Sequence, residues 1–223
     1  YDDVGNVMFV TDARSNDTSF SYDALNRPIG VIEAYNSAKD KRTTTTGYDA
    51  VGNVTSTRNA RNVVTSYTYD ALNRQVTVVE AANVAALRRT TTSVYDAADR
   101  LQKVIAPDGL VTEFGYDGLD RQTKVSVGIS PEVRTTTSKH DAAGNLIQSV
   151  TPSGLVTVYQ YDALNRLAST TAAGDDAEIA QFSSYAYDAA DNMVSMTDPS
   201  TAVTQYDYDA LNRLASKHVG VNA

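Results

Sequence analysis

The sequence predicts an all-β chain made of tandem antiparallel β-hairpins. A Tyr-Asp pair, replaced once by His-Asp, recurs through the whole chain at regular intervals. Each pair opens a short segment with the residue types of a tight turn, and polar and apolar residues alternate in the segment before it. Regular turns separated by period-two segments are typical of a hairpin array, in which each unit packs mainly on its neighbours.

Successive units begin 21 or 26 residues apart, with one interval of 24, so that two units form a superrepeat of 47 residues, once 45. The predicted unit starts are Tyr1, Tyr22, Tyr48, Tyr69, Tyr95, Tyr116, His140, Tyr161, Tyr187 and Tyr208. We therefore expect residues 1–223 to form a single array of about ten units, excised from a longer protein.

The turn of each unit is predicted from the third residue after the Asp. It is Gly, Asn or Asp in every unit, and these residues tolerate a left-handed backbone. The ten residues are Gly5, Asn26, Gly52, Asn73, Asp99, Asp120, Gly144, Asn165, Asp191 and Asn212. An Asp, two ordinary residues and a left-handed residue predict a type I turn closed by a β-bulge, with the Asp side chain capping the turn.

Strands are expected on both sides of each turn. In the even-numbered units a Thr, an aromatic residue and the repeat Tyr stand at alternate positions, as in Thr65, Tyr67 and Tyr69, which places them on one face. The intervening positions should face water; examples are Ser19, Ser21, Ser66, Thr68, Gln205 and Asp207. Sheet twist should curve such an array into an open spiral or partial shell.

The connections opposite the Asp turns are of two kinds. Short reversals are predicted near Pro107, Pro152 and Pro199, and longer loops at 34–41, 81–87, 128–132 and 172–180. In a regular meander all of these connections lie along one edge.

Composition excludes several chemistries. There is no Cys and no Trp, so disulfides, Cys-based zinc sites and thiol nucleophiles are ruled out. Leu, Ile, Val and Phe make up only 47 of 223 residues, and 14 tyrosines must carry much of the packing. The net charge of −8 opposes binding to nucleic acid or to an anionic membrane. No apolar run is long enough to span a membrane as a helix.

The segments Tyr-Asp-Ala-Leu-Asn-Arg-Leu at 161–167 and 208–214 resemble the mark of the YD or Rhs repeat family. The resemblance covers essentially the whole chain. It implies a spiral sheet of hairpins that in bacterial three-component toxins and Rhs effectors forms a shell around a toxic C-terminal polypeptide, and in teneurins an adhesion scaffold. The self-cleaving core of some members has no counterpart here, so the resemblance does not assign self-cleavage to this chain.

No residue pattern indicates catalysis. The repeat Asp residues form no calcium loop, and each already has a turn to cap. His140 substitutes one ring for another, and His218 has no metal-ligand spacing. The arginines after the turns are expected to pair with the Asp of their own or a neighbouring turn. The threonine runs 43–46, 90–92 and 135–137 occupy both faces of a strand, which favours strand filler over ice binding.

We therefore predict a non-enzymatic structural scaffold without cofactor or metal, part of a secreted or cell-surface protein. Expected partners are flanking repeats and a C-terminal cargo, with end-to-end self-association through unpaired strands. A glycan- or protein-binding adhesin module is the alternative. It would use Tyr67, Tyr159 and Tyr206 as a ligand platform, although a packing role for these rings is favoured. The predicted structural repeat residues are Tyr22, Asp23, Asn26, Arg27, Tyr69, Asp70, Asn73, Arg74, Tyr116, Asp117, Asp120, Arg121, Tyr161, Asp162, Asn165, Arg166, Tyr208, Asp209, Asn212 and Arg213.

Overall fold

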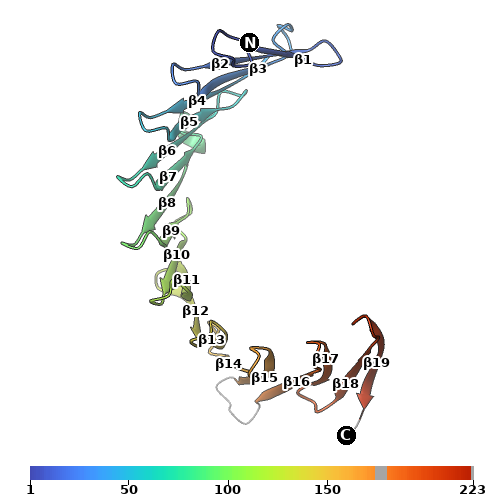
Figure 1. Ribbon diagram of the computed structural model, residues 1–223. Helices are drawn as coiled ribbons and strands as arrows, with labels where there is room; N and C mark the ends of the chain where they lie inside the picture. Colours follow the sequence, from blue (N-terminus) through green and yellow to red (C-terminus); the bar gives the residue numbers. More distant parts are fainter. Residues whose placement is uncertain (174–179, 222–223) are drawn as a thin grey trace. The chain divides into compact units, whose positions relative to one another are not determined.

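The computed structural model describes residues 1–173 and 180–221. Its strands follow one another in chain order as antiparallel hairpins (Figure 1). The nineteen strands of the described residues form an antiparallel hairpin-repeat sheet, which confirms the predicted all-β class. The chain divides into two compact units, Tyr1–Val111 and Thr112–Ala223, and each is described separately. The prediction of a single array over residues 1–223 stays a prediction.

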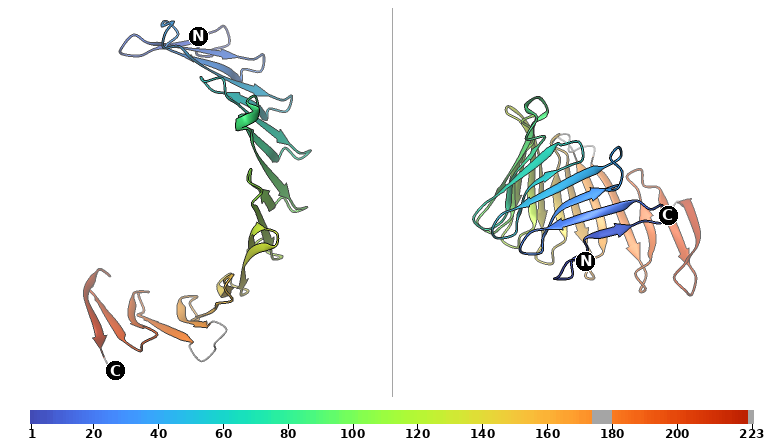
Figure 2. Two further views of the ribbon diagram at one scale, coloured as in Figure 1. Left: turned by 180° about the vertical axis from the view of Figure 1, so that it is seen from behind. Right: turned by 90° about the horizontal axis from the view of Figure 1, so that it is seen from above.

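The first unit is a meander of short strands with one turn of 3-10 helix, η1 (Ala85–Leu87). Its strands are β1 (Phe9–Thr11), β2 (Asp17–Tyr22), β3 (Pro28–Glu33), β4 (Arg42–Tyr48), β5 (Val54–Arg58), β6 (Val64–Tyr69), β7 (Gln75–Glu80), β8 (Arg89–Tyr95) and β9 (Leu101–Ile105). Each strand from β1 to β9 pairs with the next one in sequence, and the hairpins lie side by side within this unit (Figure 2).

The second unit repeats this meander. Strand β10 (Val111–Tyr116) begins at the last residue of the first unit. The strands that follow are β11 (Gln122–Ile129), β12 (Glu132–His140), β13 (Leu146–Val150), β14 (Val156–Tyr161), β15 (Leu167–Ala173), β16 (Gln181–Tyr187), β17 (Met193–Thr197), β18 (Val203–Tyr208) and β19 (Leu214–Val221). From β11 onward each strand again pairs with its successor.

The registers place some aromatic residues opposite β-branched ones. Phe20 lies opposite Val31, and Tyr67 opposite Val78. Pairs of this kind stabilise a sheet by about 0.2–1 kcal/mol each. The aromatic face therefore gains stability from pairs that join neighbouring strands.

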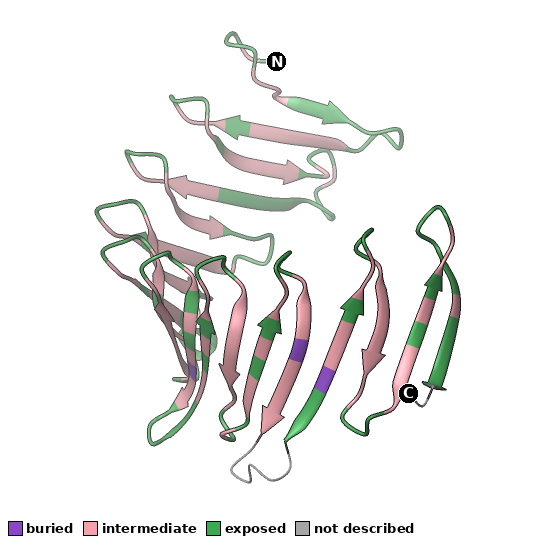
Figure 3. Cartoon of the chain, turned by 60° about the horizontal axis from the view of Figure 1, so that its bottom comes forward, coloured by how far each residue is buried: buried purple, intermediate pink, exposed green. Residues whose placement is uncertain are grey.

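The sheet has no thick core (Figure 3). Ala81 is the only buried apolar residue among those described, and none of the large side chains there is fully buried. The most buried polar residues are Ser126, Ser169 and Ser183. A single layer cannot enclose side chains as two packed layers do. Hydrogen bonds along the strands and at their ends must therefore supply an unusual share of the stability.

Some side chains on the polar face are less exposed to solvent than the alternation of polar and aromatic residues predicts. Ser21, Thr68, Gln205 and Asp207 are exposed, but Ser19 and Ser66 are half-buried. Cross-strand hydrogen bonds explain part of the burial elsewhere on this face: the Ser126 and Thr135 hydroxyls lie 2.9 Å apart, and Ser169 donates to Gln160 at 3.1 Å. Small hydroxyl side chains let neighbouring strands shield one another.

Turns and loops define two edges, which we name for use below. The Asp-turn edge of each unit carries the turns that follow the repeat Tyr-Asp or His-Asp pairs. The loop edge carries the other connections, and the short reversals predicted near Pro107, Pro152 and Pro199 are present there. The predicted long loops 34–41 and 81–87 also lie on this edge, whereas the predicted loop 128–132 is shortened to residues 130–131, because the strands on both sides extend into it. Most of the predicted loop 172–180 lies outside the described residues.

Candidate functional site

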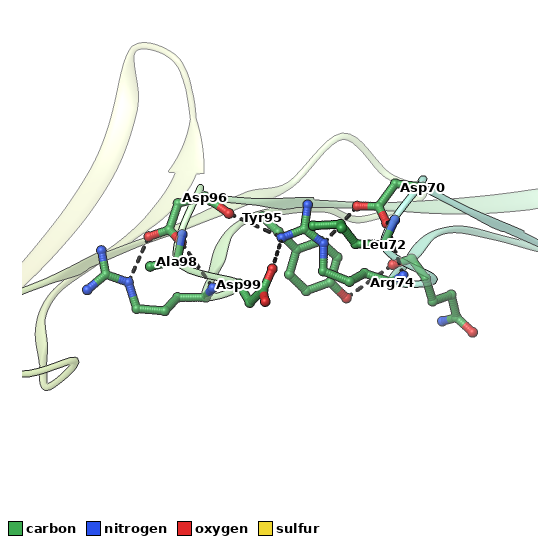
Figure 4. Close-up of polar contacts among 9 residues, drawn as sticks. Asp70, Leu72, Arg74, Tyr95, Asp96, Ala98 and Asp99 are labelled. Carbon is green, nitrogen blue, oxygen red and sulfur yellow. Dashed lines mark hydrogen bonds and ion pairs between the residues drawn. The ribbon is translucent and has the colours of Figure 1, made fainter.

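The Asp turn is the recurring polar site of the chain, and Figure 4 shows the one at Asp70. The backbone N–H of Asn73 donates to the backbone carbonyl of Asp70 at 3.0 Å, and Asn73 has φ +60°. Asp70 Oδ1 accepts the backbone N–H of Leu72 at 2.9 Å and of Arg74 at 3.0 Å, while Oδ2 accepts Arg74 Nε at 2.7 Å. The register shifts between Thr68 and Tyr69. This is a type I turn with a bulge, capped by its Asp.

The residue four positions after the Asp completes each turn, and it is either Asn or Arg. Six turns place a guanidinium on the carboxylate at 2.7–2.8 Å. In four others an Asn side chain donates instead, at 2.8–2.9 Å. The turn of Asp96 and Arg100 belongs to the Arg type.

The turn carboxylates are strong acceptors. In the turn of Asp162 the backbone N–H and the guanidinium of Arg166 donate hydrogen bonds that lower the pKa of Asp162 below its ordinary value, although burial acts in the opposite direction. The pKa is lowered in all ten repeat turns, those of Asp2, Asp23, Asp49, Asp70, Asp96, Asp117, Asp141, Asp162, Asp188 and Asp209. The folded sheet therefore holds these groups as anions.

In four Arg-type turns the Arg also reaches the next turn, and Figure 4 shows this link for Arg74. Arg74 Nη1 donates to the Asp96 carbonyl at 3.2 Å and to Asp99 Oδ1 at 2.6 Å. The guanidinium also lies 4.9 Å from the Tyr95 ring centroid, within range of a cation–π contact. Arg27 and Arg166 repeat this arrangement over Tyr48 and Tyr187.

An Asn pair joins each Asn-type turn to the following one. Asn53 Nδ2 donates to Asn73 Oδ1 at 2.9 Å. The Tyr69 hydroxyl donates to the Val54 carbonyl at 2.9 Å, so that the tyrosine also reaches back to the preceding hairpin. Three further Asn pairs have the same geometry, Asn6 with Asn26, Asn145 with Asn165 and Asn192 with Asn212. We call the Arg and Asn links between successive turns of one compact unit its turn ladder.

The repeat tyrosines of the described residues do not stack ring on ring from one hairpin to the next. Phe9 and Tyr35 form the one aromatic ring pair that the structure shows in its described part. A complete strand lies between successive repeat tyrosines, and two strand spacings amount to about 10 Å. The phenol therefore reaches a backbone carbonyl instead, as Tyr161 does to Leu146 at 3.0 Å.

The structure places the predicted repeat residues as follows. In the second unit Tyr116 ends β10, the turn of Asp117, Asp120 and Arg121 follows, and Arg121 Nη1 donates to the Asp141 carbonyl at 2.6 Å. Tyr208 ends β18 and donates to the Met193 carbonyl at 3.1 Å. The remaining residues occupy equivalent places, namely Tyr22, Asp23, Asn26, Arg27, Tyr69, Asp70, Asn73, Arg74, Tyr161, Asp162, Asn165, Arg166, Asp209, Asn212 and Arg213.

On the loop edge, sequence reasoning predicted the reversal at Asp198 but not its capping, and it missed the capped turns at Asp12 and Asn59. Asp12, Asn59 and Asp198 each accept backbone N–H groups two and four residues on, as the repeat Asp residues do. The pattern Asp-Ala-Arg-Ser at 12–15 has the same form as Asp-Ala-Leu-Asn and could have revealed them. The asparagines Asn36 and Asn83, which tie a long loop to the adjacent short turn, have no such signal.

Two arginines with different surroundings test the link between turns. We expect Arg166→Lys to lower the thermal midpoint by roughly 2–6 °C. A Lys cannot reproduce the contacts of Arg166 with Asp162, with the Asp188 carbonyl and with the Tyr187 ring.

Arg213→Lys is the matched control, because Arg213 contacts only its own turn and its side chain is 72% exposed. Arg213→Lys should leave the thermal midpoint within about 1 °C of that of the unmodified chain. Equal effects of the two substitutions in thermal unfolding followed by circular dichroism would contradict the role of the link.

His140 stands where the other repeats have the Tyr of the Tyr-Asp pair. Its Nδ1 is buried without a hydrogen-bond partner. The Tyr at the equivalent place in other units donates to the carbonyl of the preceding hairpin, as Tyr187 does to Leu167 at 3.0 Å, and packs under an Arg. An imidazole is too short to repeat this contact.

We expect His140→Tyr to raise the free energy of unfolding by about 1 kcal/mol, because it removes the unpaired nitrogen and adds a phenol hydroxyl beside Arg121. Urea unfolding measures this effect. An unchanged or lowered stability would show that the site does not accept the repeat geometry.

The proposed platform residues Tyr67, Tyr159 and Tyr206 are half-buried in strands β6, β14 and β18. The Tyr159 hydroxyl lies 3.4 Å from Ser149 Oγ, and Lys217 Nζ lies 5.7 Å from the Tyr206 ring centroid. These contacts belong to sheet packing. Binding of a ligand by the three rings stays a prediction.

One exposed cluster has the composition of a catalytic triad. Ser216 Oγ donates to Asp207 at 2.5 Å, and His218 Nε2 lies 3.0 Å from Ser216 Oγ and 3.1 Å from Asp207. A triad requires Asp at one ring nitrogen and Ser at the other. Here both contact the same nitrogen, so this cluster does not activate the serine.

The part of the chain that the structure describes has no group of three or more His, Cys, Asp or Glu side chains arranged to hold a metal ion. No helix in that part combines the length and the apolar character needed to cross a membrane.

The fold and the turn ladders define a tandem β-hairpin repeat protein. A model of the RHS repeat matches residues 1–38, 48–85, 95–128, 140–177 and 183–220. The chain therefore belongs to the RHS repeat family.

Solved structures show the same fold in much longer chains. The crystal structure of TcdB2-TccC3 aligns with a TM-score of 0.69 and 16% identity, over 94% of this chain and 12% of that one. The Photorhabdus luminescens Tc holotoxin pore, with a mutated TccC3, aligns with a TM-score of 0.64 and 17% identity, over 92% of this chain and 12% of that one. At these identities the likeness shows the fold alone. A search of curated proteins finds no match to this chain.

Proposed function

We propose that this chain is a structural wall segment of a larger RHS-repeat shell, which encloses or displays another polypeptide of its parent protein. The observation that carries the proposal is the likeness of 94% of the chain to 12% of the TcdB2-TccC3 chain. A segment that aligns over nearly its whole length with a small part of a longer repeat fold is expected to have flanking repeats.

Two features of the described residues support a wall rather than a catalytic domain. The sheet is a single layer without a thick core, so both faces stay available to an interior and an exterior. The polar groups of the Asp turns are engaged in the turns and in their links. A hydrolytic or transfer site requires free, converging groups instead.

Small-angle X-ray scattering of the 223-residue chain tests the wall. A compact domain of this length has a radius of gyration of about 17 Å. We expect a distinctly larger value with a scattering profile of a thin curved sheet. A radius near that of a compact domain, with the profile of a solid particle, would overturn the proposal.

Enclosure requires a second experiment on the parent protein. A polypeptide that lies behind the wall should resist a protease under native conditions and should be cut once mild acid opens the sheet. Cleavage of that polypeptide at equal rates before and after opening would restrict the proposal to display.

A further inference from the structure

The tips of the Asp turns carry apolar side chains where water would favour polar ones. In most repeats the residue two positions after the repeat Asp donates its backbone N–H to the carboxylate of that Asp, yet its side chain points out of the turn. The ten tip residues are Val4, Leu25, Val51, Leu72, Ala98, Leu119, Ala143, Leu164, Ala190 and Leu211. The seven larger ones are 64–72% exposed. Each compact unit therefore presents one aliphatic tip per hairpin along its Asp-turn edge.

The loop edge supplies an internal control. Its short turns have the same hydrogen bonds and the same left-handed fourth residue, as at Ser15 and Asn62. The equivalent tip residues there are all polar: Arg14, Arg61, Asp108, Ser153 and Ser200. Turn geometry therefore does not require an aliphatic tip. The difference points to a contact made by the Asp-turn edge.

The loop edge of the first compact unit also carries exposed apolar side chains. Tyr35 and Leu87 project from its two long loops and are 45% and 62% exposed. Between the loops, Arg42, Asn59 and Arg61 line a shallow hollow. The tips recur once per hairpin and the long loops once per pair of hairpins, so that the loop spacing is about twice the tip spacing.

The charges of the two edges are also complementary. In each of the two compact units the five turns of the Asp-turn edge together hold seven aspartates and three arginines. In the first unit the loop edge, taken as segments 11–17, 33–42, 58–63, 80–89 and 106–110, holds eight Lys and Arg side chains and six carboxylates. Opposite net charges favour a tips-to-loops orientation and disfavour tips against tips.

We propose that the Asp-turn edge docks on the loop edge of the first unit of a second copy of this chain. The contact is heterologous, because two different edges meet, so that the pairing can continue from copy to copy. The second copy is the occupant because it carries loops at about twice the tip spacing, exposed apolar groups and the opposite charge. The association does not depend on whether the array encloses a polypeptide.

Sedimentation velocity over a concentration series measures this association. We expect the unmodified 223-residue chain to form reversible oligomers, and we expect their association to weaken when NaCl is raised from about 50 to 500 mM. Serine at Leu25, Leu72, Leu119, Leu164 and Leu211 together should raise the dissociation constant about tenfold or more. The matched control replaces the exposed strand residues Val94 and Val158 with Ser and should retain the dissociation constant of the unmodified chain. A strictly monomeric unmodified chain, or unchanged association of the five-leucine variant, would overturn the proposal.

Cysteine cross-linking identifies the surfaces, because the natural chain contains no Cys. Under oxidising conditions, Leu72→Cys mixed with Leu87→Cys should form mainly the mixed disulfide dimer. Phe9→Cys mixed with Val219→Cys tests the alternative of end-to-end strand pairing, because these residues lie in β1 and β19. Preferential cross-linking of this second pair would assign the association to strand ends and overturn the edge docking.

Discussion

Lowering the pH from 7 to 3 is expected to unfold the sheet or to reduce its urea midpoint severely. The pKa of each of the ten repeat aspartates is lowered in the folded chain, as for Asp23, whose carboxylate accepts the Arg27 backbone N–H and guanidinium. A carboxyl group whose folded pKa lies below its unfolded value stabilises the fold fully above the unfolded value. That stabilisation is lost as the pH falls from the ordinary Asp value of 3.8 through the folded pKa.

The size of the effect comes from repetition. Every hairpin carries such a carboxylate, and the single-layer sheet has little buried apolar area to compensate for its loss. Urea unfolding between pH 7 and 3, followed by circular dichroism, gives the stability, and its slope against pH gives the number of protons taken up on unfolding. We expect uptake of several protons near pH 3–4.

Salt separates turn protonation from general repulsion, because the chain also acquires a large positive charge in acid. Added NaCl of about 0.5 M screens repulsion between exposed charges but leaves the hydrogen bonds of the turns unchanged. Asp162→Asn should reduce the pH dependence, since an amide does not titrate. An unfolding midpoint that stays constant from pH 7 to pH 3 would contradict the account.

Tyr161→Ala is expected to cost about 2–3 kcal/mol of unfolding free energy. The ring is half-buried on the aromatic face, and its hydroxyl donates to the Leu146 carbonyl of the preceding hairpin. Burial also raises the pKa of Tyr161. Removal of the ring takes away packing and leaves a backbone carbonyl without its partner.

Phenylalanine variants divide this loss between ring and hydroxyl. Tyr161→Phe keeps the ring and should cost about 1 kcal/mol. Tyr67→Phe is the control: Tyr67 lies on the same face, and the structure shows no hydrogen bond from its hydroxyl among the described residues, so its cost should be near zero. If Tyr161→Phe proved as neutral as Tyr67→Phe in urea unfolding, the phenol link between hairpins would be excluded.

The hairpin and its turn were predictable because they depend on local chemistry. Asp23 followed by Asn26 determines a turn with a left-handed fourth residue, and Asn26 has φ +60° as expected. The alternation around Tyr67 and Tyr69 indicated a two-faced strand. Each of these inferences uses residues within one hairpin.

The ladder between turns was not predictable in the same way. The acceptors of Arg74 and Tyr69 include backbone carbonyls, which every residue has and which therefore leave no trace in the sequence. Which carbonyl is reached depends on how neighbouring hairpins stack. The Asn53 to Asn73 bond likewise depends on stacking.

A double-mutant cycle on Arg74 and Tyr95 tests most directly the claim that links between successive turns hold this thin sheet together. The guanidinium lies over the Tyr95 ring and reaches the turn that follows it. We predict that Arg74→Ala and Tyr95→Ala together destabilise the chain less than the two single losses added, because each single variant already breaks the shared contact. Arg74→Ala combined with Tyr22→Ala, two turns away, should be additive. Additive losses for Arg74 and Tyr95 in urea unfolding would contradict the account.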